Sequence, residues 1–372
     1  MNYPRSSSSR REFIRLLALG GATLAGGVPA LRAQLAAAEL KPGRRLGVAL
    51  LGLGKYSTGQ LGPALLETKL CQLTGVITGT PSKGVEWAQK YNLLKDNVYS
   101  YETMDRIADN PAIDIVYVVT PPALHRQFTE RLAKAGKHVI TEKPMATSVE
   151  DCDAMIAACK AARVKLSVGY RLHFDLYHRE LVRLAKEKDF GPFTTITGDR
   201  GFVFKARAWR IDKKLGGGGP MMDLGIYIIQ GACMAAGAAP ISVTAHEEPK
   251  TNPELFNEVE EKMRWSMTFP DGAVCNAVAG FAHSSDRFRA EAPKGWFELT
   301  EHAFTYRGMV GATSRGPLKY TAINQQAAQM DDFADCVMTG RETPVPGAMG
   351  RRDIRILTAI YEAAATGKPV KI

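Results

Sequence analysis

No stretch of this 372-residue sequence is long and apolar enough to suggest a stable membrane anchor. A membrane-spanning helix needs about 20 mostly apolar residues, whereas the uncharged run Leu16–Leu31 is shorter and contains four glycines. Blocks of five or more Lys or Arg residues are also missing, and the net charge of +10 falls to +6 once the first 38 residues are left out. A generally basic surface explains that balance better than a nucleic-acid-binding stripe, so we expect no nucleic-acid partner.

Cysteine is scarce, with six residues and no C-x-x-C pair. Cys152 and Cys159 fall in one expected helix, where seven residues separate their Cα atoms by about 10 Å, too far for a disulfide. The seven histidines show no spacing typical of a metal site. We therefore expect buried free thiols and no metal site.

Residues 1–38 are typical of a targeting segment rather than of a folded domain. Arg10 and Arg11 precede Phe13 and Ile14, the uncharged run follows, and small residues lead up to Ala38. This order resembles the twin-arginine export signal, whose pathway carries proteins that have already folded. We expect a periplasmic protein; an amphipathic or disordered tail is the alternative.

From Leu46 onward, short apolar runs alternate with segments of helical period. The strand-like runs are Leu46–Leu51, Leu73–Thr78, Asp114–Thr120, His138–Thr141 and Lys165–Tyr170, and the helical segments are 57–67, 82–91, 102–109, 125–135 and 149–162. This alternation predicts βαβ units around a parallel sheet. We expect an α/β Rossmann domain over 46–170, preceded by a short arm at 39–45.

The first strand leads directly into a glycine-rich turn and a helix. The turn reads Gly52, Leu53, Gly54, Lys55, Tyr56, Ser57. Gly52 permits the tight turn, and Gly54 lets the backbone approach a pyrophosphate at the helix N-terminus. Because serine replaces the third glycine, the fingerprint is imperfect, and a structural turn without a ligand is the alternative.

The end of the second strand indicates which dinucleotide is bound. An acid there would accept hydrogen bonds from the ribose 2′-hydroxyl of NAD, but the chain has Thr78, Gly79, Thr80 and, shortly after, Lys83. Hydroxyls and a lysine suit a 2′-phosphate, so these residues favour NADP(H). A loop of the same composition without that role is the alternative.

Two further motifs connect the chain to a known family. The segment Ala135–Pro144 reads A-G-K-H-V-I-T-E-K-P, and Gly217–Tyr227 reads G-G-G-P-M-M-D-L-G-I-Y. Both resemble the Gfo/Idh/MocA oxidoreductases, and tyrosine at the end of the second motif matches the branch of the glucose-fructose and aldose-aldose oxidoreductases. The resemblance implies a second α+β domain with a large, open, mostly antiparallel sheet.

The sequence of residues 171–372 agrees with such a domain. Strand-like runs are Phe193–Phe204, Ile241–Glu248, Glu258–Phe269, Ala273–His283 and Phe288–Thr300, and helical patterns occupy 329–339 and 349–365. We expect this domain to hold the substrate and to form oligomers, and we leave open whether its C-terminal helices pack back on the first domain.

Three residues form the expected catalytic set. Lys143 lies at the carboxyl edge of the parallel sheet, where open α/β folds place ligands. Asp223 and Tyr227 are four residues apart on one face of a helix that begins near Pro220. The ammonium of Lys143 would stabilise a Tyr227 phenolate that removes a hydroxyl proton, and Asp223 would orient the hydroxyl or the lysine. A structural salt bridge and a packed ring are the alternatives.

Further contacts with the cofactor or sugar are expected from residues that border these motifs. They are Lys55 and Tyr56 in the glycine-rich turn, Thr120, Pro121 and His125 after the fourth strand, Glu142 before Lys143, and Arg171, Trp209 and Arg210, the last three also matching the family.

Together with these residues, the resemblance implies an oxidoreductase that oxidises an aldose at C1 to a lactone and reduces a second sugar to an alditol in a ping-pong cycle. Since an exported enzyme would not meet free NADP, we expect the nucleotide to be tightly bound, with the arm at 39–45 as its clamp or as a solvated tail. The alternatives are a conventional NADP-dependent dehydrogenase with exchangeable cofactor and a non-catalytic binding protein on the same fold. An open sheet with an apolar face or exposed edges also predicts a homo-oligomer, either a dimer or a tetramer.

Overall fold

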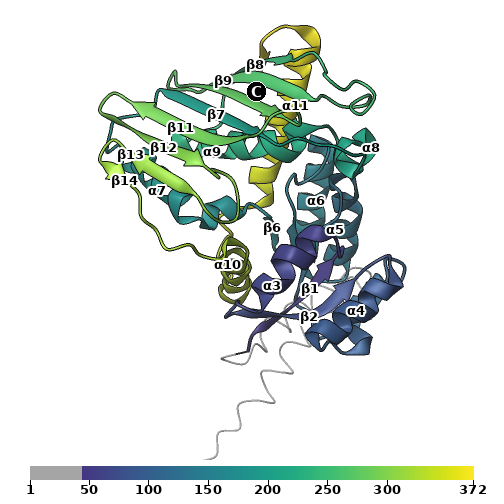
Figure 1. Cartoon of the computed structure of the whole chain (residues 1–372). Coiled ribbons are helices and arrows are strands. Elements are labelled where there is room, and N and C mark those ends of the chain that lie inside the picture. Colours follow the sequence, from purple (N-terminus) through teal and green to yellow (C-terminus); the bar gives the residue numbers. More distant parts are fainter. Residues whose placement is uncertain (1–43) are drawn as a thin grey trace, which may run out of the picture.

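A computed structural model describes residues 44–372; the expected signal at 1–38 and arm residues 39–43 lie outside this part of the chain. The first domain contains a parallel sheet with strand order β3-β2-β1-β4-β5-β6 (Figure 1). Its strands are β1 (Leu46–Leu51), β2 (Cys71–Ile77), β3 (Val98–Tyr99), β4 (Ile115–Val118), β5 (His138–Thr141) and β6 (Leu166–Val168). This is the doubly wound order of dinucleotide-binding domains, so the predicted Rossmann class is confirmed.

Helices cover both faces of this sheet because its strands are apolar on both sides. In β1, Leu46, Val48 and Leu50 face one layer, whereas Ala49 and Leu51 face the other. The first layer includes α3 (Gly62–Leu65), α4 (Pro81–Tyr91) and α10 (Gln325–Thr339). The second includes the 3₁₀ segment η3 (Met104–Asp109) and α5 (His125–Lys134), against which α6 (Val149–Ala162) packs. Thus α10, late in the chain, completes the core of the first domain (Figure 1).

The second domain contains a sheet with strand order β14-β13-β12-β11-β7-β10-β9-β8-β15. Its strands are β7 (Thr195–Gly201), β8 (Ser242–Glu247), β9 (Lys262–Thr268), β10 (Val274–Gly280), β11 (Ser285–Ala292), β12 (Gly295–Glu301), β13 (Val310–Thr313), β14 (Gly316–Pro317) and β15 (Val370–Lys371). Only β7 and β10 pair in parallel among these strands. The expected large, open, mostly antiparallel sheet is therefore confirmed.

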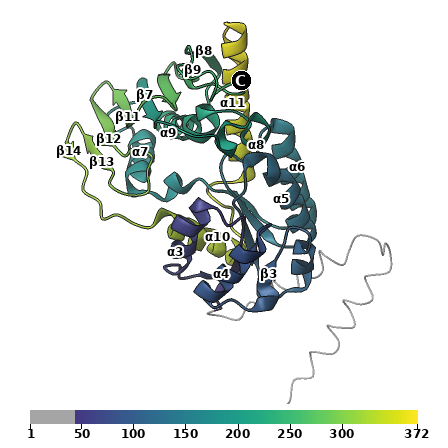
Figure 2. The ribbon, with the colours of Figure 1, turned by 45° about the vertical axis from the view of Figure 1, so that its right-hand side comes forward.

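One face of this second sheet packs on helices of the same chain. These are α7 (Leu176–Glu187), α9 (Ile226–Ala236) and α11 (Gly347–Thr366), which lie on one side of the strands (Figures 1 and 2). The approach of α9 to β7 is close, because a Cβ atom at Gly198 would lie 2.4 Å from Cγ2 of Ile228. Only glycine fits at this position of β7 without displacing the helix that carries Tyr227.

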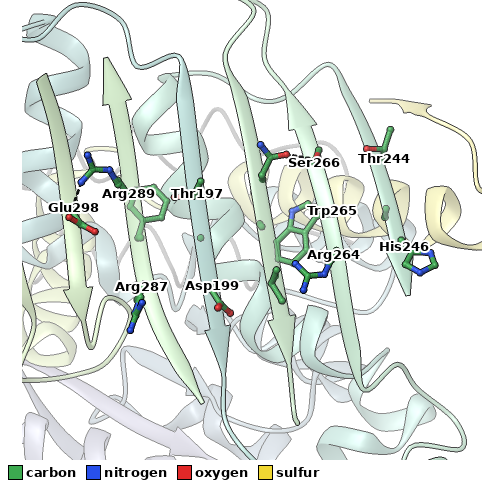
Figure 3. Close-up of a pocket in the computed structure, with 16 residues that line it drawn as sticks. Thr197, Asp199, Thr244, His246, Arg264, Trp265, Ser266, Arg287, Arg289 and Glu298 are labelled. Carbon is green, nitrogen blue, oxygen red and sulfur yellow. Dashed lines mark hydrogen bonds and ion pairs between the residues drawn. The ribbon is translucent and has the colours of Figure 1, made fainter. Parts of the chain in front are cut away.

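The opposite face is open and polar, and its side chains line a hollow of about 780 Å³ (Figure 3). Arg289 pairs with Glu298 at 2.9 Å, and Ser266 donates a hydrogen bond to Asn276 at 2.6 Å. None of Lys143, Asp223 and Tyr227 lines this hollow, so it is separate from the candidate active site.

The physical reason for expecting a homo-oligomer is wrong, because the chain's own helices cover the apolar face. The edges of the sheet are also short, since β14 and β15 have two residues each, and short edge strands limit edge-to-edge pairing. Oligomerisation stays a prediction without that support.

The structure differs from the expected elements at several places. The run Phe288–Thr300 is not one strand: β11 and β12 form a hairpin around Pro293 and Lys294. The helix α7 was not expected, and where an α-helix over 102–109 was expected the chain forms the 3₁₀ segment Met104–Asp109. Pro293 has no N–H to donate to a strand ladder, so it marks the turn.

All six cysteines are buried and unpaired. Within residues 44–372, no three or more His, Cys, Asp or Glu side chains gather as a metal-binding group would. In the same range, no helix has the length and apolar character that a membrane crossing requires.

Candidate active site

The candidate site lies where the parallel strands of the first domain end. Thr78 follows β2, Thr120 and Pro121 follow β4, Lys143 follows β5, and Arg171 comes shortly after β6. Since the carboxyl ends of parallel strands share one edge of the sheet, the fold brings these residues to the same side.

The glycine-rich turn has the backbone that its sequence predicts. Gly52 has a φ of +98°, a backbone conformation that favours glycine. A Cβ atom there would also lie 2.6 Å from the carbonyl oxygen of Val119, so there is no space for a side chain. Ser57, at the place of the third glycine, is fully buried and donates a hydrogen bond to the Gly52 carbonyl at 2.6 Å. The serine therefore stabilises the turn that a glycine would otherwise only permit.

Two observations show that this edge fits a dinucleotide. A Cβ atom at Gly54 would meet nothing within 4 Å, so the backbone there is open to a ligand. The hydroxyl of Thr120 is buried and has no hydrogen-bond partner in the described chain, a situation that costs free energy unless a ligand or water meets it. Lys55 is exposed beside Gly54.

The end of β2 carries hydroxyls and a nearby ammonium. The backbone N–H of Thr80 donates to the Thr78 hydroxyl at 3.2 Å, which shapes the loop. Gly79 lies against Tyr101, where a Cβ atom would come within 2.9 Å of the ring. Lys83 donates to the carbonyl of Leu53 at 3.3 Å, so its positive charge lies at the glycine-rich turn.

Lys143, Asp223 and Tyr227 come together as expected. The ammonium of Lys143 donates to the backbone carbonyl of Asp223 at 2.8 Å and to its carboxylate Oδ1 at 3.2 Å. The same ammonium lies 4.4 Å from the centre of the Tyr227 ring. Arg210 donates to the other carboxylate oxygen of Asp223 at 3.1 Å. Burial opposes the charge of Asp223, but Lys143 and Arg210 outweigh it and keep the pKa of this carboxyl below its ordinary value.

Three cations surround Tyr227. Besides Lys143, the guanidinium carbons of Arg200 and Arg171 lie 4.1 Å and 5.1 Å from the ring centre. Burial alone would raise the pKa of Tyr227, yet the three positive charges together hold it below the ordinary value for tyrosine. A tyrosine in this field forms a phenolate more readily than one in water, which suits a proton acceptor.

The helical segment that carries Asp223 and Tyr227 is fixed at its start by a buried carboxylate. The π-helical turn η7 (Met221–Gly225) leads into α9, with Pro220 just before it. Glu260 accepts hydrogen bonds from the backbone N–H groups of Gly219 and Met221 and from the hydroxyl of Tyr361. This carboxylate satisfies N–H groups that a helix start leaves without partners.

Two residues expected to touch the cofactor support the chain instead. His125 is fully buried, and its ring nitrogens face the backbone carbonyls of Thr120, Pro144 and Met145, so it has no surface to offer a ligand. Glu142 accepts the hydroxyl hydrogen bond of Tyr117 at 2.6 Å and the backbone N–H of Lys143 at 3.1 Å. His125 thus fixes the segment that follows Lys143, and Glu142 fixes the residue itself.

Arg171 and Arg210 lie beside the catalytic set. Arg171 is 2% exposed and donates to the backbone carbonyls of Phe304 and Thr305, so almost none of its surface is open to a ligand. Arg210, which pairs with Asp223, stacks on Trp209 at 4.5 Å.

The arm does not reach the nucleotide site where the structure describes it. Arg44 pairs with Asp114 at 2.6 Å, and Arg45 donates to the carbonyls of Thr68 and Cys71. These partners lie before or at the start of β2 and β4, at the opposite edge of the sheet from Lys143. These two arginines therefore fasten the start of β1 and do not form the clamp over the nucleotide that was one of the two expectations for the arm.

Sequence reasoning missed Arg200 and Tyr306. A signal for Arg200 was present, because Ile196, Gly198 and Arg200 share one face of β7 under a period of two, and the first two face the helices. A charge on an inward face is unusual and points to a partner or a function. Tyr306 carried no comparable signal, since it lies in the irregular segment between β12 and β13.

Comparison with known proteins agrees with this geometry. Residues 46–170 match the Gfo/Idh/MocA oxidoreductase family, NAD-binding Rossmann fold, and residues 178–298 match the C-terminal domain of the same family. The chain therefore belongs to the Gfo/Idh/MocA oxidoreductases.

Individual relatives within this family include a solved structure and two curated enzymes. The crystal structure of aldose-aldose oxidoreductase from Caulobacter crescentus, complexed with glycerol, is 42% identical and superposes with a TM-score of 0.86 over 88% of this chain and 100% of that one. The D-xylose 1-dehydrogenase [NADP(+)] of Haloarcula marismortui is 26% identical over 87% of this chain and 92% of its own length. D-xylose 1-dehydrogenase (NADP(+)) 2 of Haloferax volcanii is 27% identical over 73% and 84%.

Proposed function

We propose that this oxidoreductase holds NADP(H) tightly, oxidises an aldose at C1 to the lactone, and reduces a second sugar to an alditol in a ping-pong cycle. The observation that carries this proposal is the cluster of Lys143, Asp223 and Tyr227, in which one ammonium contacts both a carboxylate and the tyrosine ring. Sugar-oxidising relatives, one of them an aldose-aldose oxidoreductase that is 42% identical, support the substrate class.

The chain's own residues handle the proton. Oxidation at C1 removes the hydroxyl proton and the hydrogen on the same carbon, and Tyr227 accepts the proton as a phenolate. Asp223 holds the Lys143 ammonium beside the ring, so that positive charge is already in place when the phenolate forms. Bound NADP(H) would supply the hydride acceptor in this half of the cycle and the hydride donor in the other. In the second half, the Tyr227 hydroxyl returns its proton to the carbonyl oxygen that becomes an alcohol.

The residues at the end of β2 support NADP(H) over NAD. Thr78, Gly79 and Thr80 include no carboxylate to meet a ribose 2′-hydroxyl. The ammonium of Lys83 is held at the glycine-rich turn by the Leu53 carbonyl, where it would face a 2′-phosphate.

Retention of the nucleotide needs a contact that bridges the two domains, and an aromatic pair provides a candidate. The ring of Tyr56, in the glycine-rich turn, lies 6.0 Å from the ring of Tyr306 in the second domain. Gln326 of α10 donates to the Tyr56 hydroxyl at 3.4 Å, and Arg171 lies 4.4 Å from the Tyr306 ring. These contacts connect the glycine-rich turn to the second domain.

The expected export to the periplasm supports a cycle in which the cofactor is regenerated while bound. The twin arginine at Arg10 and Arg11 favours passage through the twin-arginine pathway to the periplasm with the nucleotide already bound. Outside the cytoplasm, a dehydrogenase that depended on free NADP would stop after one turnover, so a second sugar would have to regenerate the cofactor.

The test is to incubate the purified, undialysed enzyme with an aldose and a second sugar, without added nucleotide, and to assay lactone and alditol together. The proposal predicts equal amounts of both products, far above one equivalent per subunit. A yield that stops at one equivalent until NADP is added would identify a conventional dehydrogenase with exchangeable cofactor. Tyr227→Phe serves as the control for contaminating activity.

A further inference from the structure

Arg200 differs from the other cations around Tyr227 in what holds it. Lys143 is fixed by the backbone and carboxylate of Asp223, and Arg171 by the backbone carbonyls of Phe304 and Thr305. Arg200, by contrast, has no such carbonyl partner in the described chain, and its Nη1 group is buried without a hydrogen-bond partner, as is the Nε group of Arg171. Its ion pair with Asp286 is long, with Nε 3.8 Å from the carboxylate.

The nearest groups to the Arg200 guanidinium are aromatic rings. Its guanidinium carbon lies 4.1 Å from the ring centre of Tyr227 and 5.3 Å from that of Phe304. The side chain is 14% exposed, so little water reaches it. Burying an arginine N–H group without a partner costs free energy, which calls for a role of Arg200 beyond its long ion pair with Asp286. Arginine also keeps its charge under these conditions, which makes it a permanent source of positive potential.

Strand pairing and helix packing place the charge of Arg200 close to the helix that carries Tyr227. Arg200 and Asp286 are direct partners across β7 and β11, and both occupy inward-facing positions of their strands. Gly198, two residues earlier on β7, leaves the space into which Ile228 of α9 packs. The close approach of α9 to β7 therefore brings the Tyr227 ring to the guanidinium.

We propose that Arg200 is a positioning residue for proton transfer, whose fixed charge over the Tyr227 ring favours the phenolate form that accepts the hydroxyl proton. The inference rests on the proposed function, since it assumes that Tyr227 exchanges a proton with the sugar. It adds a charge from β7 to the positive charges of Lys143 and Arg171 that favour the phenolate.

The charges around Tyr227 determine the expected direction of the pH effect. Lys143, Arg171 and Arg200 favour the phenolate, whereas burial and the negative charge of Glu142 oppose it. A negative charge on Tyr306 would also oppose the phenolate of Tyr227, but burial raises the pKa of Tyr306 well above its ordinary value. Asp223 and Asp286 pair with Lys143 and Arg200 and partly offset their charge. Removing one cation therefore raises the pKa of Tyr227 and moves its titration to higher pH.

The first test measures the rate of aldose oxidation against pH in the nucleotide-loaded Arg200→Gln and Arg200→Lys variants. Since an opposite charge at this distance changes a pKa by about one unit or more, the rise of the rate with pH should move upward by about one pH unit in Arg200→Gln. The rate of this variant should recover at alkaline pH, and Arg200→Lys should stay near the wild type. Arg315→Gln is the matched control. Arg315 also stacks on an aromatic ring, with its guanidinium carbon 4.6 Å from the ring centre of Phe190, but it lies away from the site.

Two outcomes would overturn the proposal. One is a rate of aldose oxidation in Arg200→Gln that is lower by the same factor at every pH, as expected of a structural defect. The other is a pH profile that shifts equally in Arg200→Lys and Arg200→Gln. Asp286→Asn gives an independent check if Arg200→Gln does not fold. It removes the negative charge that offsets Arg200, so the rise of the rate should move to lower pH, and a shift upward or no shift would contradict the proposal.

A readout without any sugar separates this proposal from the proposed function. Ultraviolet titration of tyrosinate, taken as the difference between the wild type and Tyr227→Phe, follows the ionisation of Tyr227 directly. It should move to higher pH in Arg200→Gln and not in Arg315→Gln. If Tyr227→Phe turns over sugars normally, the proposed proton route fails; if that variant is inactive but the titration is unmoved in Arg200→Gln, only the role of Arg200 fails.

Discussion

Replacement of Lys143 by methionine removes the ammonium from the centre of the site and keeps most of the side chain's volume. The ammonium lies 4.4 Å from the Tyr227 ring centre and 3.2 Å from the Asp223 carboxylate. An opposite charge within about 4–6 Å lowers the pKa of an acid by about 1–3 units. Loss of Lys143 should therefore raise the pKa of Tyr227 by that order, while Arg171 and Arg200 keep part of the effect.

The size of the rate loss follows from this shift. Each unit of pKa reduces the phenolate fraction at neutral pH about tenfold, so aldose oxidation should slow by ~10 to ~10³-fold, in line with general acid–base groups. The loss should shrink as the pH rises, because alkaline solution restores the phenolate. Asp223 should stay ionised, since Arg210 remains at 3.1 Å.

The assay is single-turnover reduction of the bound nucleotide by an aldose, followed by nicotinamide absorbance from neutral to alkaline pH. Lys90→Met is the matched control, because Lys90 lies 5.3 Å from the Tyr91 ring on α4, away from the site. A rate in Lys143→Met within a few-fold of the wild type at neutral pH would show that Lys143 does not control the ionisation of Tyr227. A large loss that is independent of pH would show that Lys143 acts on something other than the ionisation of Tyr227.

Other predictions concern the cofactor, the packing and the assembly. Lys83→Ala should weaken NADP binding relative to NAD by about 1.5–3 kcal/mol, the worth of a hydrogen bond to a charged group, and equal losses for both nucleotides by calorimetry would count against it. Tyr306→Ala should release nucleotide faster on dilution than the wild type does, whereas Tyr320→Ala should not, because Tyr320 packs on Tyr177. Gly198→Ala should lower the free energy of unfolding by about 1–3 kcal/mol through the clash with α9, measured by urea denaturation, and unchanged stability would mean that α9 can move. Light scattering should give a mass above the 40.5 kDa of one chain, and a monomer mass at micromolar concentration would remove the predicted oligomer.

The sequence predicted the first domain well because its signals are local. The strand Leu46–Leu51 and the helix Val149–Ala162 have the expected bounds, since an apolar run or a helical period ends at a clear polar or glycine boundary. The strand β3 was missed because two residues carry no periodicity. The helix α7 was missed although Asp175 caps its first turn, because no glycine or proline separates it from the preceding segment.

The catalytic set could be predicted because its residues lie in two continuous motifs. Lys143 comes from one motif, and Asp223 and Tyr227 come from the other, so the resemblance supplied their partnership before any distance was known. Arg200 and Tyr306 could not be found in this way. Their place beside Tyr227 depends on the pairing of β7 with β11 and on the path of an irregular segment, which are tertiary contacts between residues far apart in sequence.

The proposed cycle requires that Tyr227 exchange the proton while a sugar exchanges hydride with a nucleotide that stays bound. The measurement treats the purified wild type and, separately, Tyr227→Phe first with an aldose and then with a second sugar, without added nucleotide, and follows nicotinamide absorbance. We expect the absorbance of the wild type to rise with the aldose and to fall with the second sugar. In Tyr227→Phe, loaded with as much nucleotide, both changes should be at least ~10²-fold slower. Rates in Tyr227→Phe within a few-fold of the wild type would contradict it.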